Sequence, residues 1–270
     1  MVFESLKEKC YYYQKLNDYK LMPNGYILAH LDGKNFSKLI KNKMEKPFDD
    51  DFINAMNETA LYLCQNVPEV KCAFVQSDEI SLFIENGYEA DLMFGGRLCK
   101  LQSILASMAT AKFNREMEKY YMEKDYLLSK DLPDEICLTG KQVLEEVPLY
   151  NFDCKIWNVP DINDVMAWFL FRRNDCVRNS RQQTAQTYCS HKELVGKDTM
   201  EQIKYLKEKT GIDWEEFDED KKCGRFFYKQ KFDLFKEVNG EKIDYNRLKW
   251  IKENGKFIEN YFIMRDDFIF

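Results

Sequence analysis

The sequence has no long hydrophobic run, only two histidines and no Cys-x-x-Cys pair. Because a membrane span needs about 20 consecutive apolar residues, we expect no contact with a membrane. The N-terminus lacks a signal-peptide pattern, and nine scattered cysteines are typical of reduced thiols. We therefore predict a soluble, cytoplasmic protein. His30 and His191 are too few for a zinc site or for histidine-based acid–base catalysis, so carboxylates and basic residues must supply most of any chemistry.

Glycine and proline are also sparse, with 11 and 6 residues, and no repeat, linker or low-complexity tract interrupts the chain. The sequence therefore marks no sharp domain boundary. With 45% hydrophobic and 15% aromatic residues among 270, the chain has the composition of a folded globular protein, which excludes disorder. The net charge of −6 excludes nonspecific coating of nucleic acid but permits a local basic groove.

The order of apolar patterns predicts an α+β fold. Strands are predicted at residues 26–31, 70–75, 80–84 and 152–159, and helices at 3–16, 49–66, about 91–121, from 161 past 176, and around 198–209. Residues 76–79 read as a turn, which makes 70–84 a hairpin with acids at its tip. This mixed order is typical of a mostly antiparallel sheet covered by helices, followed by a C-terminal helical and extended region.

Two acidic motifs follow predicted strands, Asp32-Gly33 and Ser77-Asp78-Glu79. If the two strand ends meet at one edge, Asp32, Asp78 and the Gly33 carbonyl supply the hard oxygen ligands that Mg²⁺ prefers beside substrate phosphates. Two such ions activate an attacking oxygen and stabilise a leaving pyrophosphate. The alternative is that both aspartates are ordinary turn residues, since Asp and Gly favour turns.

Several separated motifs resemble the tRNA-His guanylyltransferase family, over about residues 20–230. They are Leu31-Asp32-Gly33-Lys34-Asn35-Phe36, Lys46-Pro47, Gln76-Ser77-Asp78-Glu79-Ile80-Ser81, Phe152-Asp153, the run 172–180, Ser190-His191-Lys192-Glu193-Leu194 and Lys222-Cys223-Gly224. The resemblance implies a polymerase-like palm and addition of nucleotides in the 3′-to-5′ direction at the 5′ end of tRNA. The implied partners are the tRNA 5′ end and acceptor stem, with ATP, GTP or other triphosphates. The family commonly forms tetramers, so we expect a homo-oligomer.

The resemblance also implies a role for each site residue. Asp32, Asp78 and Glu79 would be catalytic, with two or more Mg²⁺ ions held by Asp32, Gly33 and Asp78. The triphosphate would be bound by Gly33, Lys34, Asn35, Phe36, Ser37, Ser77, Arg97 and Lys100. The tRNA or a second nucleotide would be bound by Arg172, Asp175, Arg178, Asn179 and Lys222.

Two departures from the family pattern favour its guanylyltransferase-like branch. Members dedicated to tRNA-His carry Arg and His where this chain has Lys34 and Ser37, and a His with paired Asn where it has the run 177–180. The branch is implied to repair 5′-truncated tRNA by templated addition. The alternatives are dedicated addition of G to tRNA-His, a nucleotide cyclase built on the same palm, and a non-catalytic RNA-binding protein.

Basic segments allow both functional and structural interpretations. Arg97 and Lys100 share a helix face and either contact phosphates or are solvated. The arginines at 172–181 either bind RNA or form an internal salt-bridge network with the acidic stretch 215–220. The segment 221–231 alternates cations with aromatic residues; we favour an edge strand over a stacking surface for nucleic acid. Cys176 and Cys189 are predicted core thiols, and His191 a structural residue at a helix start.

For domain organisation we predict a catalytic domain at 1–240, with a palm core at about 20–160 and a helical part contacting tRNA or nucleotide at about 161–240. Residues 241–270 lie outside the resemblance and form an appendage. The sequence does not decide whether this appendage docks on the core or on another subunit.

Overall fold

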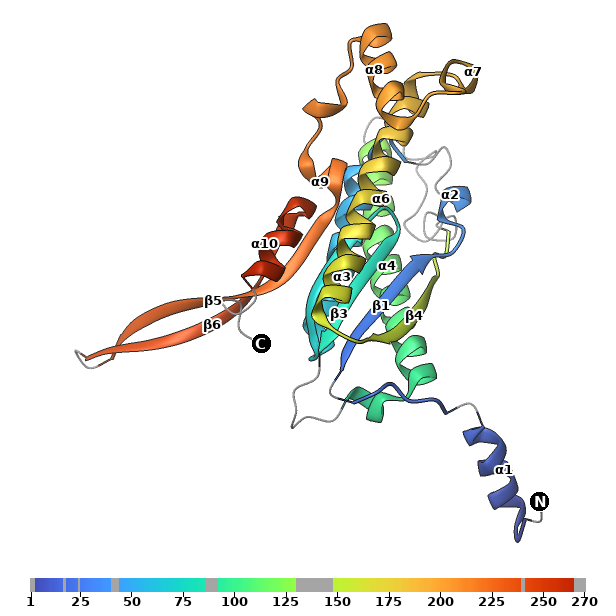
Figure 1. The fold of residues 1–270 in the computed structure, drawn as a ribbon, viewed down its shortest axis with the longest axis vertical. Helices are drawn as coiled ribbons and strands as arrows, with labels where there is room; N and C mark the ends of the chain where they lie inside the picture. The colour runs from blue at the N-terminus through green and yellow to red at the C-terminus, as the bar shows by residue number, and fades with distance from the viewer. Residues whose placement is uncertain are drawn as a thin grey trace.

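The computed structural model describes residues 3–16, 18–23, 25–39, 44–85, 92–129, 148–238 and 241–264. These residues form one six-stranded sheet in the order β4-β1-β3-β2-β5-β6 (Figure 1). The strands are β1 (Tyr26–Gly33), β2 (Val70–Gln76), β3 (Glu79–Glu85), β4 (Phe152–Val159), β5 (Arg225–Val238) and β6 (Glu241–Asn254). Neighbouring strands are antiparallel throughout. The prediction of an α+β fold with an antiparallel sheet is therefore confirmed.

Helices cover both faces of the sheet (Figure 1). Helices α3 (Asp50–Asn66) and α4 (Leu98–Ser129) bury one face in the larger apolar core. Helices α6 (Ile162–Tyr188) and α10 (Ile258–Ile263) bury the other face in a second core. The remaining helical segments are α1 (Leu6–Lys15), α2 (Phe36–Leu39), η1 (Met93–Gly96), α7 (His191–Leu194), α8 (Thr199–Thr210), η2 (Trp214–Glu216), α9 (Glu219–Cys223) and η3 (Gly255–Phe257).

The acidic hairpin forms as predicted. In β2 and β3 the last paired residues are Gln76 and Glu79, so Ser77 and Asp78 alone make the turn. Ser77 has a φ of 42°, in the left-handed region that tight hairpin turns use. Apolar side chains dominate both strands, and this burial fixes their register. The carboxylates of the tip are therefore held on a rigid element.

The long helix starts later and ends later than predicted. We expected it from about residue 91 to 121, whereas α4 spans Leu98–Ser129; residue 91 lies outside the described residues. The three residues Phe94, Gly95 and Gly96 have φ between 56° and 70°, which an α-helix cannot accommodate. This left-handed run makes up most of η1, and α4 begins after it, at Leu98.

The predicted edge strand in the basic segment is wrong for residues 225–228, although residues 229–231 of β5 pair with β6 alone. Residues 225–228 of β5 lie between β2 and β6, and β6 is the edge of the sheet. The inward packing of the aromatic residues is confirmed, since Phe226, Phe227 and Tyr228 are buried. Sequence patterns missed β6 because its long alternation of charged and apolar residues lies outside the family motifs.

Part of the C-terminal segment docks on the body of the protein. Ile258 and Tyr261 of α10 are buried against α6 in the second core. β6 pairs with β5 along its length, and this hairpin extends away from the helices (Figure 1). The proposed boundary at residue 240 lies between these two paired strands, and the division into domains stays a prediction. In the described part of the chain, none of the helices has the length and apolar character needed to cross a membrane.

Candidate active site at the end of strand β1

Three acidic residues lie side by side across three strands. Asp32, near the end of β1, is the register partner of Glu79 in β3 and of Asp153 in β4. Residues directly opposite one another in an antiparallel pair project to the same face of the sheet. Asp78 joins them from the hairpin turn, where its carbonyl oxygen accepts a hydrogen bond from the Gly33 amide at 3.1 Å. The structure therefore brings together the predicted catalytic residues Asp32, Asp78 and Glu79.

Gly33 is required for this close approach. A Cβ at residue 33 would lie 2.9 Å from the Asp78 Cβ and 2.8 Å from the Phe36 ring. The Phe36 ring is fully buried and packs against Phe113 and Tyr150, with ring centroids 5.3 and 5.0 Å away. Phe36 thus anchors the loop that follows β1 in the core, and we find no surface on it for a direct nucleotide contact.

The rest of this loop presents backbone and polar groups to solvent. Lys34 and Asn35 are exposed, the Lys34 amide donates to the Asn151 carbonyl at 2.8 Å, and Asn35 has a φ of 61°. Ser37 lies in α2, but its side chain lies outside what the structure describes. The Gly33 and Lys34 amides both donate within the protein, so contact of the rest of this loop with a triphosphate stays a prediction.

The acids carry more negative charge than the protein neutralises. Burial raises the pKa of Asp78 to about 6, although backbone and Ser77 hydrogen bonds act in the other direction. Burial, followed by the charges of Glu79 and Asp153, also raises the pKa of Asp32. Of these four acids only Glu79 forms an ion pair within the described residues. The unpaired carboxylates form a site that favours a cation.

The donor set suits magnesium bound together with phosphate. The described residues contain no group of three or more His, Cys, Asp or Glu side chains arranged to hold a metal by themselves. Mg²⁺ commonly takes one or two carboxylates and completes its shell with water and substrate phosphates. Asp32, Asp78 and the Gly33 carbonyl fit that requirement, because they offer few but hard oxygen ligands.

Arg172 supports the acids from α6. This arginine is 8% exposed, binds the Glu79 carboxylate and lies 3.3 Å from the Asp175 carboxylate. Asp175 also binds Arg178, and it accepts a hydrogen bond from Asn179 at 3.2 Å. A salt-bridge network therefore exists, and Arg172 belongs to its buried part. Arg178 and Asn179 are exposed, so their contact with tRNA or a second nucleotide stays a prediction.

The salt-bridge network of α6 does not include the acidic stretch 215–220, which the sequence analysis named as its possible partner. Within the described chain, the acidic stretch 215–220 pairs with lysines and with no arginine of α6. Lys222 is one of these lysines: it is 4% exposed and lies 2.9 Å from the Glu219 carboxylate and 2.8 Å from the Glu215 carbonyl. Its ammonium group is already surrounded by acceptors, which contradicts the predicted contact of Lys222 with tRNA.

Arg97 and Lys100 lie far from the acids. Arg97 forms a backbone bridge with Lys20. Two residues further on, the Met22 amide donates to the side chain of Asn158, near the end of β4, and this end of β4 pairs with the start of β1. Asp32 lies six residues beyond the start of β1, roughly 20 Å away at 3.3 Å per residue. Lys100 lies over the Phe94 ring, 4.6 Å from its centroid. Within one chain the structure therefore contradicts their shared contact with the triphosphate held at Asp32.

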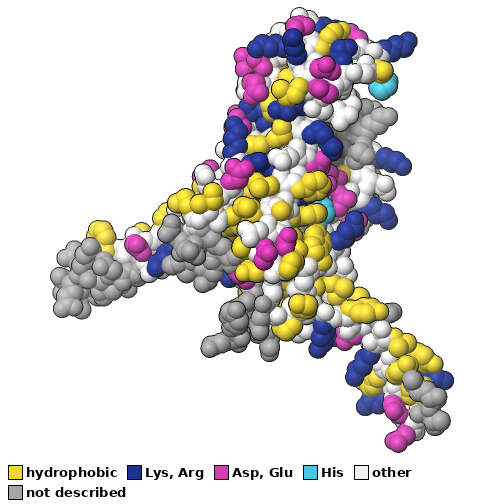
Figure 2. Space-filling model, in the orientation of Figure 1, with side chains coloured by type: hydrophobic (Ala, Val, Ile, Leu, Met, Phe, Trp, Pro, Cys, Tyr) yellow, Lys and Arg dark blue, Asp and Glu magenta, His cyan; other side chains and the backbone are white. Residues whose placement is uncertain are grey.

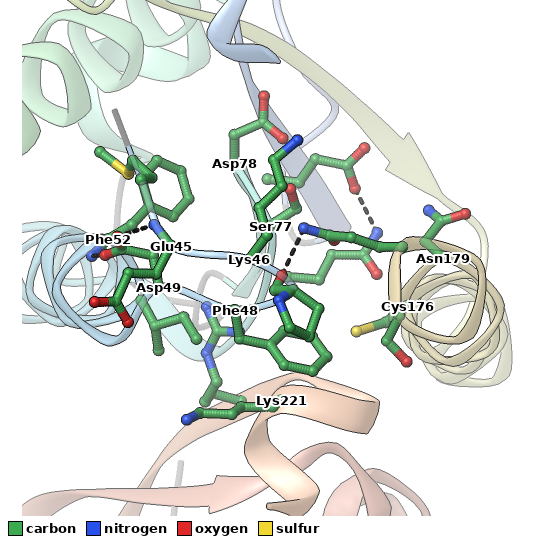
Figure 3. Close-up of a pocket in the computed structure, with 18 residues that line it drawn as sticks. Glu45, Lys46, Phe48, Asp49, Phe52, Ser77, Asp78, Cys176, Asn179 and Lys221 are labelled. Atoms are coloured by element: carbon green, nitrogen blue, oxygen red, sulfur yellow. Dashed lines mark hydrogen bonds between the residues drawn. The ribbon is translucent and has the colours of Figure 1, made fainter. Parts of the chain in front are cut away.

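A pocket of about 210 Å³ opens beside the acidic hairpin (Figure 3). The loop 44–49 forms one wall, α6 the opposite wall, and the hairpin tip with Ser77 and Asp78 the rim. Gln183 of α6 donates to the Pro47 carbonyl at 2.7 Å, and Asp49 accepts from the Phe52 amide at 2.8 Å. These bonds hold the loop against two helices, so the pocket is preformed.

The sequence interpretation missed several residues of this site. Asp153 was noted only within the motif Phe152-Asp153, although it pairs directly with Asp32. Gln183 also lines the pocket and stands in no pattern that points to it, whereas Arg225, a further lining residue, lies in the basic segment 221–231. Cys176 lines the pocket as a buried thiol whose pKa burial raises to about 12; Cys189 is buried as well. His191 is the first residue of α7, as predicted.

The comparisons with known proteins agree with this geometry. The family model for tRNAHis guanylyltransferase matches residues 7–160. The uncharacterized protein R259 of Acanthamoeba polyphaga mimivirus is 25% identical over 222 residues, covering 79% of this chain and 73% of that protein. The chain is 26% identical to the probable tRNA(His) guanylyltransferase of Dictyostelium discoideum, over 55% of this chain, and 26% identical to the tRNA(His) guanylyltransferase of Neurospora crassa, over 61% of this chain. It spans about half of their length, 50% and 49%.

Solved structures show the same fold. A bacterial tRNA(His) guanylyltransferase (Thg1)-like protein in complex with ATP aligns with a TM-score of 0.72 at 29% identity, over 83% of this chain and 88% of that chain. A bacterial protein of the same description in complex with GTP aligns with a TM-score of 0.64 at 27% identity, over 97% and 95%. Carboxylates beside a pocket can hold the metal ions that polymerases and other phosphoryl-transferring enzymes use, which fits a nucleotidyltransferase. The chain belongs to the tRNAHis guanylyltransferase family.

Proposed function

We propose that this protein is a magnesium-dependent nucleotidyltransferase that adds nucleotides in the 3′-to-5′ direction to the 5′ end of tRNA. The observation that carries the proposal is the juxtaposition of Asp32 and Asp78, which the Gly33–Asp78 hydrogen bond holds together. Both have a raised pKa and no ion-pair partner in the described chain, and Asp78 stands at the rim of an open pocket. Membership of the tRNAHis guanylyltransferase family supplies the substrate class. The ATP and GTP complexes of the two bacterial proteins support triphosphates as co-substrates.

Each group of the site has a role in this proposal. Asp32, Asp78 and the Gly33 carbonyl hold magnesium, which when bound supplies activation of the attacking oxygen and stabilisation of the leaving pyrophosphate. Glu79 is oriented by Arg172 and by Gln76, whose amide donates to it at 2.5 Å. The backbone from Gly33 to Ser37 faces the phosphates, and the pocket takes the nucleoside.

The reaction has two transfers. In the first, an oxygen of the tRNA 5′-monophosphate attacks the α-phosphate of ATP or GTP, and pyrophosphate leaves. In the second, the 3′-hydroxyl of an incoming triphosphate attacks the activated 5′-phosphate, and the nucleoside monophosphate leaves. Both transfers need a neutralised phosphate and an attacking oxygen in line with the leaving group, which the fixed positions of Asp32 and Asp78 support.

We further propose template-dependent repair of 5′-truncated tRNA as the activity of this chain. Lys34 replaces a residue typical of members dedicated to tRNA-His, and Val177 and Arg178 stand in a run that those members fill with other residues. Arg178 is exposed near the pocket wall that α6 forms. Exposed lysines surround α7 and α8, where Figure 2 shows Lys and Arg side chains interspersed with acids. This end of the molecule, with its exposed lysines, is the surface that we propose for the tRNA, in a homotetramer by analogy with the family.

The choice of substrate tests the proposal. The protein is incubated with Mg²⁺, ATP and all four triphosphates, and with either a 5′-monophosphorylated tRNA lacking its first nucleotide or a full-length tRNA-His, and the 5′ ends are mapped. We expect templated extension of the truncated tRNA. Extension of tRNA-His alone would instead establish dedicated G addition. A cyclic nucleotide formed without tRNA would establish a cyclase, and no product from any mixture would leave RNA binding as the function.

A further inference from the structure

An aromatic surface runs from the edge strand β4 to the first turns of α6. It consists of Trp157 of β4 and of Trp168 and Phe171 of α6. The ring centroids of Trp157 and Trp168 are 4.9 Å apart, and those of Trp168 and Phe171 are 5.9 Å apart. Phe171 is 55% exposed, and both tryptophans are half-buried. Three adjoining rings that reach solvent differ from the single apolar side chains that protein surfaces commonly carry.

Neighbouring side chains hold these rings in place. The Trp168 indole nitrogen donates to the Ser81 hydroxyl at 3.1 Å, and the Trp168 ring packs edge-on against His30 at a centroid distance of 5.4 Å. The Arg172 guanidinium lies 5.3 Å from the centroid of the Phe171 ring. A surface that is already ordered loses little conformational entropy when a ligand binds to it.

Arg172 connects the aromatic surface with the acids. The guanidinium that lies beside Phe171 also binds the carboxylate of Glu79. Glu79 is in turn the register partner of Asp32, and such partners are about 4.5–5.5 Å apart at Cα. One side chain and one strand spacing therefore separate Phe171 from the proposed metal ligand Asp32.

Strand β4 adds a cation on the same face. Asp153, Lys155 and Trp157 stand at alternate positions of β4, so their side chains project to one face of the sheet. Lys155 is exposed, and its charge opposes the rise that burial causes in the pKa of Asp32. Lys155 therefore lies between the acids and Trp157. Figure 2 shows hydrophobic side chains over α6 and β4, with Lys and Arg side chains beside them.

These features fit unpaired nucleotides. Aromatic rings beside cations are the elements with which proteins bind single-stranded nucleic acid, and bases inside a duplex are not free to stack on side chains. In the proposed reaction the 5′ phosphate of the RNA lies at Asp32. A tRNA that has lost its first nucleotide keeps the opposite nucleotide of the 3′ strand without a pairing partner. The unpaired bases nearest Asp32 are therefore those of the 3′ strand.

We propose that the aromatic surface stacks unpaired bases of the 3′ strand of the substrate RNA, and that Lys155 contacts the phosphates of that strand. This inference rests on the proposed function and deepens it, because it names the surface that holds the strand to be copied. Residues 168–171 of α6 then face the template strand, and residues 176–183 line the pocket for the triphosphate. Phe171, Trp168, Trp157 and Lys155 are positioning residues and take no part in the transfer itself.

The affinities of the full-length protein for two RNAs test the inference, with Mg²⁺ and without triphosphates, so that no transfer takes place. The first RNA is the 5′-monophosphorylated tRNA lacking its first nucleotide. The second is the same RNA shortened at its 3′ end, so that both strands end at one base pair. We expect the first RNA to bind at least about tenfold more tightly, a ratio that the stacking of one base on an aromatic side chain can produce.

Variants then assign this preference to the aromatic surface. We expect Phe171→Ala to reduce the preference at least about fivefold and Phe171→Trp to retain it, because any flat ring can stack on a base. Lys155→Met should lower the slope of log affinity against log salt by about 0.7, the value for one contact with a single-stranded phosphate. The matched control is Met122→Ala, since Met122 is also apolar and 45% exposed but lies on α4, across the sheet. It should leave both quantities unchanged.

Thermal unfolding and gel filtration show whether each variant is folded and has the oligomeric state of the unaltered protein. Phe171 and Lys155 are both exposed, so we expect neither substitution to change these properties. If Phe171→Ala were not folded, Phe171→Ser and the salt dependence of Lys155→Met would provide the test. Loss of the oligomer in Phe171→Ala, with the RNA preference retained, would assign the aromatic surface to a second copy of the chain and overturn the inference.

The remaining outcomes separate the inference from the proposed function. Equal affinity of the unaltered protein for the two RNAs, together with nucleotide addition to the truncated tRNA, would overturn the inference and leave the proposed function standing. Failure to bind either RNA or to add a nucleotide to it would overturn both. A preference that Phe171→Ala retains in full would place the unpaired strand elsewhere on the protein.

Discussion

Gly33 and Asp78 join two segments of the sheet through one backbone hydrogen bond of 3.1 Å, with no room for a side chain on the glycine. This contact fixes the distance between the ends of β1 and of the β2–β3 hairpin. Since Asp32 precedes Gly33 in the chain, the same contact sets the spacing of the two carboxylates. Gly33 does not have a left-handed φ. A glycine is required at this position because a Cβ would overlap its neighbours, and not because of the backbone conformation.

Substituting Gly33 should separate the carboxylates. A Cβ would lie within 3 Å of both Asp78 and the buried Phe36 ring, and relieving this overlap costs about 1–3 kcal/mol of stability. We expect Gly33→Ala to lower the rate of nucleotide addition at least about a hundredfold, the order of loss that a misplacement of about 1 Å causes. Single-turnover rates and urea denaturation would measure the two effects.

The matched control for this prediction is Gly25→Ala, next to the other end of β1. There a Cβ would meet only the Asn158 side-chain amide at 3.2 Å and the Met22 carbonyl at 3.6 Å. We expect near-normal rates for Gly25→Ala. Equal rates for both alanine variants would show that the Gly33 contact does not position the acids.

Replacing Asp78 should stabilise the protein in the absence of divalent ions. A rise of the pKa from 3.8 to about 6 means that ionised Asp78 is unfavourable in the folded state, by about 3 kcal/mol at neutral pH. The folded protein binds the proton more tightly than the unfolded chain, so this cost is absent below about pH 4, grows between pH 4 and 6, and is constant above that range.

We therefore expect Asp78→Asn to be more stable than the unaltered protein at pH 7 and equally stable near pH 4, in urea denaturation with EDTA. The variant should at the same time be inactive, because an amide is a weaker magnesium ligand than a carboxylate. If Asp78→Asn were destabilised at pH 7, the carboxylate would have an unrecognised partner, and the argument for an uncompensated cation site would fail.

Removing Arg172 should cost more than removing its neighbour Arg178. Arg172 is buried and pairs with Glu79 and Asp175, whereas the Arg178 side chain is 64% exposed. Breaking a buried pair typically costs about 3–5 kcal/mol, and an exposed pair about 0–1 kcal/mol. We expect Arg172→Met to lower the free energy of unfolding by about 3–5 kcal/mol and Arg178→Met by about 0–1 kcal/mol, as measured by urea denaturation.

A double-mutant cycle separates the ion pair from packing. In Arg172→Met/Glu79→Gln no charge is left without its partner, so we expect the double variant to recover at least about 1 kcal/mol relative to the sum of the single changes. Additive effects would mean that Arg172 stabilises the protein only by filling space between α6 and the sheet.

Local patterns in the sequence predicted much of the fold, and the reasons are physical. Apolar runs placed β1, β2, β3 and β4 to within a few residues, and an acidic turn between two such runs located Asp78 at a hairpin tip. Asp32 was found because a carboxylate just before a glycine at a strand end is a local signal. These features depend on residues close in sequence.

Features that depend on distant residues were missed or misplaced. Arg97 was assigned to the triphosphate from the resemblance to the family, but the path of the chain takes it to the opposite end of β1. Lys222 follows four consecutive charged residues in sequence, which did not reveal its burial among Glu215, Glu219 and Trp214. Asp153 pairs with Asp32 across more than a hundred residues, and periodicity carries no information about such pairing.

The central claim is that Asp32 and Asp78 hold the metal for nucleotide addition at a tRNA 5′ end. The most direct measurement maps the 5′ end of a 5′-monophosphorylated tRNA lacking its first nucleotide after incubation with Mg²⁺, ATP and all four triphosphates, for the unaltered protein and for Asp78→Asn. The account predicts restoration of the missing nucleotide by the unaltered protein and none by the variant, although the variant is at least as stable. Extension at the same rate by both proteins would contradict it.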